Sequence, residues 1–118
     1  MQKKRDIYGR IYKFVLKVLL LIKTVPKELI NLEICKQLIR SVTSVGANAR
    51  EAQAAQSKRE FIHCLSISKK ESKESWYWLT LLSKLNLNIT LKLEEFIKEC
   101  DELTAIISSI IKKARENS

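Results

Sequence analysis

Acidic side chains three residues apart are the first feature of this sequence that could perform chemistry. On a helix, residues at this spacing share one face, and Glu71 with Glu74 is one such pair. Glu60 stands three residues before His63, which is the only histidine. Ferritin-like bundles bind two metal ions through a Glu from each of two helices and a Glu-x-x-His motif from two more. One histidine completes half of that set, so we expect no metal and no cofactor and rank a metal-dependent enzyme last.

Other catalytic signatures are missing from the sequence. It has no Gly-rich phosphate-binding loop, no Gly-x-Ser-x-Gly motif and no Cys-His-Asp trio at a recognisable spacing. The polar residues midway along the chain have a structural interpretation, because a hydrogen-bonded Asn or Glu in a core fixes helix pairing. We favour that interpretation for Asn48, Glu51, Glu71 and Glu74, and we expect a protein that is not an enzyme.

Basic side chains are in excess, and their distribution along the chain is uneven. The 22 Lys and Arg residues outnumber 13 Asp and Glu residues, for a net charge of +9. Residues 1–59 hold 13 basic and 4 acidic side chains, whereas residues 60–118 hold 9 of each. Such an asymmetry predicts a positive face for a polyanion, with nucleic acid as the first choice. A solvated surface that serves only solubility is the alternative, and the sequence leaves it open.

The candidate ligands for a phosphate backbone lie in the basic first half. Arg10, Lys13 and Lys17 follow the i, i+3, i+7 rule and form a stripe opposite the apolar face of their helix. No arrangement here predicts base-specific readout. The full set of candidates is Lys3, Lys4, Arg5, Arg10, Lys13, Lys17, Lys36, Arg40, Arg50, Lys58 and Arg59.

Three adjacent aromatic residues, Trp76, Tyr77 and Trp78, cannot all face the inside of a helix bundle. Trp78 is expected in the core, so Trp76 or Tyr77 must point sideways or outward. An exposed aromatic ring suits base stacking or a subunit interface. We favour the interface.

The elements that must position these residues are helices. In 118 residues there are only two glycines and one proline, too few turn signals for an all-β fold. Apolar periodicity predicts one domain, residues 1–118, that is an all-α, antiparallel, up-down-up-down four-helix bundle. The predicted helices cover residues 6–24, 27–55, 58–85 and 90–115.

Local signals refine these boundaries and one helix contact. Ser57 and Glu60 form a capping box that begins the third helix, and Asn88 or Thr90 can cap the fourth. Gly46 inside the second helix indicates that another backbone comes close there.

Cysteine usage and hydropathy indicate the compartment. Cys35, Cys64 and Cys100 are odd in number and lie within apolar-periodic segments, as expected of buried thiols in a reducing cytoplasm. The uninterrupted apolar run, Val18 to Ile22, is far shorter than the ~20 residues of a membrane span. We therefore expect an unprocessed cytoplasmic protein with no membrane partner.

Three stretches resemble a known family. Residues 36–52 (KQLIRSVTSVGANAREA), together with residues 57–62 (SKREFI) and 70–79 (KESKESWYWL), resemble the four-helix-bundle proteins encoded in 23S rRNA intervening sequences. That family includes the accessory variability determinant of diversity-generating retroelements. The resemblance implies a homopentameric barrel, RNA or DNA binding, and a reverse transcriptase as partner. It brings no catalytic residue. The matching positions, which we interpret as packing and helix-pairing groups, are Arg40, Ser41, Ser44, Asn48, Glu51, Glu71, Glu74 and Trp78.

Together these observations predict a non-catalytic, basic, homo-oligomeric bundle that binds RNA or DNA backbone as an accessory or scaffold. An oligomeric protein-interaction module without nucleic-acid binding is the alternative.

Overall fold

The computed structural model describes residues 6–117, and these residues form four α-helices with no strand among them. Each helix begins and ends within two residues of its predicted range. The prediction of a four-helix, all-α fold is confirmed. The elements are α1 (Ile7–Ile22), α2 (Leu29–Gln53), α3 (Lys58–Leu85), the short 3₁₀ helix η1 (Leu87–Ile89) and α4 (Thr90–Glu116).

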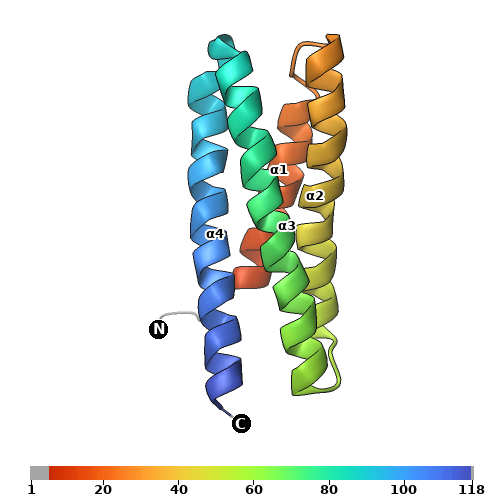
Figure 1. Ribbon diagram of the computed structural model, residues 1–118, viewed down its shortest axis with the longest axis vertical. Coiled ribbons are helices and arrows are strands. Elements are labelled where there is room, and N and C mark those ends of the chain that lie inside the picture. Colours follow the sequence, from red (N-terminus) through yellow and green to blue (C-terminus); the bar gives the residue numbers. More distant parts are fainter. Residues whose placement is uncertain (1–5, 118) are drawn as a thin grey trace.

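The helices lie side by side in an elongated body of 49 × 32 × 19 Å. The connections of α1 to α2 and of α3 to α4 lie at one end, and that of α2 to α3 lies at the other (Figure 1). α3 packs along α2 and α4, while α1 lies behind α3 in this view and also contacts α2 and α4. Each helix therefore has two helical neighbours around one core.

Side chains at the N-caps of the first three helices accept hydrogen bonds from the free backbone amides of the first turn. The Asp6 carboxylate accepts from the Gly9 amide, and the Ser57 hydroxyl accepts from the Glu60 amide at 3.0 Å. The second half of the predicted capping box is displaced by one residue, because the Glu60 carboxylate accepts from the amide of Gln56 rather than that of Ser57. The sequence thus located the start of α3 correctly.

The start of α4 differs from the prediction, since neither Asn88 nor Thr90 caps it. Ile89 occupies the N-cap position without a side-chain hydrogen bond, and the Thr90 hydroxyl donates to the carbonyl of Ser83 at 2.9 Å. The 3₁₀ helix η1 leads directly into α4, so the backbone enters the helix already wound. A helix entered in this way leaves no extended residue to act as a cap.

Small hydroxyl groups fill the middle of the core, where α3 contributes Ser68, Ser72 and Ser75, all buried. The Ser75 and Ser41 hydroxyls share a hydrogen bond of 2.8 Å, and those of Ser72 and Thr104 one of 2.7 Å. These bonds join α3 to α2 and to α4. Short side chains let helices approach closely, and the hydroxyl partners remove the cost of burying polar groups.

Gly46 provides a close approach between α1 and α2. A Cβ atom at this position would lie 3.2 Å from Cγ2 of Val15, tighter than ordinary van der Waals contact. The sequence predicted that another backbone comes close to Gly46. The nearest atoms belong instead to the Val15 side chain.

Two buried side-chain amides join segments that lie 55 residues apart in the sequence. Asn31 and Asn86 are 1% and 6% exposed and exchange two side-chain hydrogen bonds of 2.8 and 3.0 Å. Asn31 also donates to the carbonyl of Pro26. This pair fixes the loop before α2 against the end of α3, and no pattern in the sequence predicted it.

The cysteines are free thiols buried in the core. Burial raises the pKa of Cys100 to about 12, and its thiol donates to the carbonyl of Ser72 at 3.1 Å. Along residues 6–117, no helix has the length and apolar character that crossing a membrane requires.

Candidate nucleic-acid interface

Arg10, the first member of the predicted basic stripe on α1, is held by carboxylates of α4. Its Nε and Nη2 atoms lie 2.7 Å from the two carboxylate oxygens of Glu99, and Nη2 also lies 2.7 Å from Glu102. These hydrogen bonds raise the pKa of Arg10 above its ordinary value. These ion pairs occupy donors that a phosphate would need, so they argue against Arg10 as a phosphate ligand, and that role stays a prediction.

The rest of the stripe faces mixed charge. Lys13 and Lys17 are exposed, but the groove that they line with Arg10 also contains Glu95 and Glu99 of α4. Carboxylates in the lining of the same groove repel a phosphate backbone. The α1 stripe is therefore a poorer polyanion surface than its own charges suggest.

Arg40 is also engaged, in a cluster that joins α2 to α3. Its guanidinium lies 3.3 Å from the carboxylate of Glu71 and forms a second ion pair with Glu74. The Trp78 indole donates to Glu74 at 3.0 Å, and this bond, with that from Arg40, lowers the pKa of Glu74. Arg40 thus joins α2 to α3, and its role as a phosphate ligand stays a prediction.

The predicted polar core is not a single buried cluster. Asn48 is half-buried and donates to the Ser44 hydroxyl and carbonyl within α2, both at 3.0 Å, while Glu51 is exposed. Glu71 and Glu74 meet Arg40 near the surface instead of joining this pair. The buried serines of α2 and α3 occupy the middle of the core, where these groups were predicted.

The other predicted ligands are scattered over the molecule. Lys36 lies 3.6 Å from Glu33 within α2, and the Lys58 ammonium donates to the carbonyl of Asn117 at 2.6 Å. Arg50 and Arg59 are exposed. Lys3, Lys4 and Arg5 lie outside the described residues.

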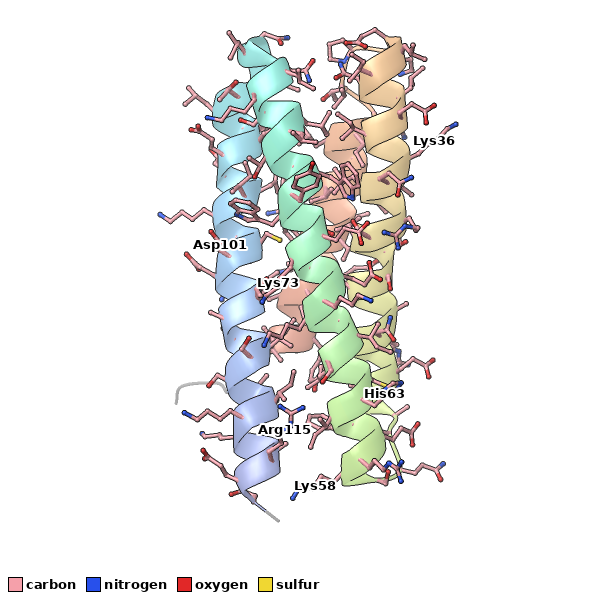
Figure 2. All side chains as sticks on the ribbon, in the orientation of Figure 1. Lys36, Lys58, His63, Lys73, Asp101 and Arg115 are labelled. Carbon is pink, nitrogen blue, oxygen red and sulfur yellow. The ribbon has the colours of Figure 1, made fainter. Side chains whose placement is uncertain are left out.

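A basic groove lies between α3 and α4, in the half of the chain with no net charge. It has a volume of about 420 Å³. Figure 2 shows Lys73 of α3 and Arg115 of α4 at the junction of the two helices. Among residues 6–117, no acidic residue lines this groove. We call it the α3–α4 groove, and its lining residues are Ser66, Lys69, Lys70, Lys73, Ile111 and Arg115.

The net charge of residues 60–118 is zero, so the charge count of this half gave no sign of a basic groove. Acidic residues of the same half lie on other faces, where Glu99 meets α1 and Glu71 meets α2. The available signal was the spacing of Lys69, Lys70 and Lys73, which places three cations on one face of α3.

Two exposed aromatic rings continue that face. Trp76 is 38% exposed and Tyr77 is 51% exposed, three and four residues beyond Lys73. The Tyr77 ring meets Trp78 edge-on, with 4.9 Å between centroids, and Trp78 packs half-buried against the core. The expected orientation of the three rings is confirmed.

Residues 6–117 bring together no group of three or more His, Cys, Asp or Glu side chains that could hold a metal ion. Glu60 caps α3, and His63 is exposed nearby on the same helix (Figure 2).

Comparisons with known proteins identify relatives by sequence and by fold. The family model of the 23S rRNA-intervening sequence protein matches residues 3–109. A crystal structure of a protein with unknown function from the S23 ribosomal protein family of Bacteroides thetaiotaomicron VPI-5482 is 35% identical, with a TM-score of 0.81. The alignment covers 90% of this chain and 95% of that one. A search of curated proteins found no match. The chain therefore belongs to the 23S rRNA-intervening sequence protein family.

Proposed function

We propose that this protein is a non-catalytic, homo-oligomeric bundle of antiparallel helices that binds the backbone of RNA or DNA in the cytoplasm, as an accessory or scaffold. The observation that carries the proposal is the net charge of +9. No Lys or Arg within residues 6–117 is buried. A surface of this kind attracts a polyanion over distances of about 10 Å at moderate salt.

The family supports a nucleic-acid setting for this charge. Its description names an intervening sequence of 23S rRNA, which makes RNA the first polymer to test. The relation to retroelement accessory proteins, with a reverse transcriptase as partner, stays a prediction from the resemblance.

Self-assembly has its own physical support in an exposed apolar surface on α1 and α2. Tyr12, Leu16 and Leu20 are spaced four residues apart along α1, and all are exposed. On α2, Leu32 and Ile39 are exposed as well. Several large apolar side chains exposed on neighbouring helices are typical of a protein interface. We propose that this surface packs against a second copy, in the pentameric barrel that the resemblance implies.

The proposal is tested by size-exclusion chromatography with light scattering, followed by titration of a labelled RNA at increasing salt. We expect one species near five times the 13.7 kDa chain mass, and an affinity that falls linearly with salt on logarithmic axes. Absence of RNA binding at about 50 mM salt, or a salt-independent affinity, contradicts the nucleic-acid function.

The apolar surface also favours the second candidate function, an oligomeric protein-interaction module. A defined oligomer that binds no nucleic acid at low salt would support that function instead. Leu16→Glu with Leu20→Glu should dissociate the oligomer under either function, so this variant tests the interface independently of binding.

A further inference from the structure

The α3–α4 groove has cations on both sides and, among residues 6–117, no carboxylate in its lining, whereas the grooves lined by Lys13 and Lys17, by Lys23 and Lys27, and by Lys17 and Lys92 each include a glutamate. Lys69, Lys70 and Lys73 come from α3 and Arg115 comes from α4. None of the three lysines is in an ion pair within residues 6–117.

The neighbouring helix faces explain why the groove lacks acidic groups. Glu71 and Glu74, which alternate with these lysines along α3, are directed to Arg40 of α2. Glu99 and Glu102 of α4 are directed to Arg10 of α1. Ion pairing on the other sides of α3 and α4 therefore separates the two signs of charge and leaves the groove positive.

The aromatic residues lie on the same side of α3 as the lysines. Trp76 follows Lys69 by seven residues and Tyr77 follows Lys70 by seven, which is close to two helical turns. The interval from Lys69 to Tyr77 spans about 12 Å along the helix axis. The lysines are thus followed along the helix by two exposed rings. Glu74 lies between Lys70 and Tyr77, and it forms an ion pair with Arg40 of α2.

We propose that the α3–α4 groove, extended by Trp76 and Tyr77, binds a single strand of nucleic acid. This inference rests on the proposed function and names the surface that performs it. The lysines and Arg115 hold the phosphates, and the two aromatic rings stack on unpaired bases. A positive groove with adjacent aromatic rings is the arrangement that binds single strands without sequence preference.

Base stacking is the reason to choose a single strand over a duplex. The faces of paired bases are already stacked on their neighbours, so a duplex offers exposed rings nothing to stack on except at its ends. Contacts to phosphates and stacking on base faces carry no sequence information, so we expect binding to tolerate any sequence. The sugar contributes no required contact, and RNA and DNA strands should bind alike.

The test compares two variants that lose the same charge. K69Q/K70Q/K73Q removes three lysines of the groove, and K13Q/K17Q/K23Q removes three exposed lysines of α1 and its C-terminus. The probe is a fluorescein-labelled 20-nucleotide oligouridine at about 50 mM salt, with binding followed by anisotropy. We expect the groove variant to weaken binding about 10- to 100-fold and the α1 variant less than about threefold.

Stacking is tested by W76A and by Y77A against Y77F. W76A and Y77A should each weaken binding of the single strand by about tenfold, whereas Y77F should retain wild-type affinity because its ring still stacks. A duplex of the same length should bind the wild type more weakly than the single strand. Circular dichroism melting of each variant establishes that the fold is retained.

The outcomes separate this inference from the function on which it rests. If the wild type binds no oligonucleotide, both the proposed function and the assignment of binding to the groove are overturned. If the wild type binds and the two lysine variants are weakened equally, the groove assignment is overturned while nucleic-acid binding stands. If the duplex binds more tightly, or if W76A and Y77A bind as well as the wild type, the single-strand assignment is overturned.

Discussion

The α1 stripe and the α3–α4 groove carry similar positive charge but face different neighbours. Arg10, Lys13 and Lys17 lie beside carboxylates of α4, and Arg10 forms ion pairs with two of them. The lysines of the α3–α4 groove face Arg115 and uncharged side chains. The positive charge that a helix offers to a ligand therefore depends on the residues of the neighbouring helix, and not only on the net charge of its own segment.

The largest expected effect comes from separating the two helices that form the groove. Ser72 is buried and shares a hydrogen bond with Thr104 of α4. Ser72→Leu should lower the free energy of unfolding by about 2 kcal/mol, because the core has no room for the larger side chain. Chemical denaturation measures this loss.

The same variant should weaken oligonucleotide binding more than Ser72→Ala does, since only the larger residue forces α3 and α4 apart. Ser72→Ala should cost about 1 kcal/mol of stability for the lost hydrogen bond. If both variants bind like the wild type, the groove does not depend on this packing.

A smaller effect distinguishes the role of Arg10 from that of its neighbours. Arg10→Ala removes a bidentate, partly buried ion pair and leaves Glu99 and Glu102 without their counter-ion. We expect a loss of about 1 kcal/mol in the free energy of unfolding and little change in nucleic-acid affinity.

Lys13→Ala serves as the matched control, and its stability should change by less than about 0.5 kcal/mol. A strong loss of affinity in Arg10→Ala with unchanged stability would return Arg10 to the set of phosphate ligands.

The ion-pair cluster between α2 and α3 should make part of the stability depend on pH. Hydrogen bonds from Trp78 and Arg40 lower the pKa of Glu74 below its ordinary 4.5. A carboxyl with a lowered pKa in the folded state adds stability that is fully present above its unfolded pKa and is lost as pH falls through its folded pKa.

Glu74→Gln should therefore destabilise the protein at pH 7 and less at pH 3, because the stability from the Glu74 charge declines as pH falls below the unfolded-state pKa of this carboxyl group. Urea denaturation at both values measures the difference. An equal loss at pH 7 and pH 3 would show that the charge of Glu74 contributes nothing to stability.

The smallest effect tests whether acidic neighbours weaken the α1 stripe. Glu95 lines the groove beside Lys13 and Lys17, so Glu95→Gln should strengthen oligonucleotide binding by less than about twofold through reduced repulsion. Glu33→Gln on α2 removes the same charge at a distance from that groove and is the control. Equal effects of both variants would show that Glu95 affects binding only through the net charge of the protein.

The sequence predicted the features that depend on near neighbours in the chain. Apolar periodicity located the helices, and Ser57 marked the start of α3. The pairing of polar faces between helices could not be predicted, because Arg10 and Glu99 are 89 residues apart. A helical pattern shows that a face is polar without showing which face it meets. The α3–α4 groove was missed for this reason.

The most direct test of the account is the salt dependence of single-strand binding by the two triple lysine variants. Each phosphate contact with a single strand contributes about −0.7 to the slope of log K against log salt concentration. The slope of K69Q/K70Q/K73Q should therefore be shallower than that of the wild type by about 2, while K13Q/K17Q/K23Q should keep nearly the wild-type slope. Equal slopes for the two variants, or a larger change in the α1 variant, would contradict the account.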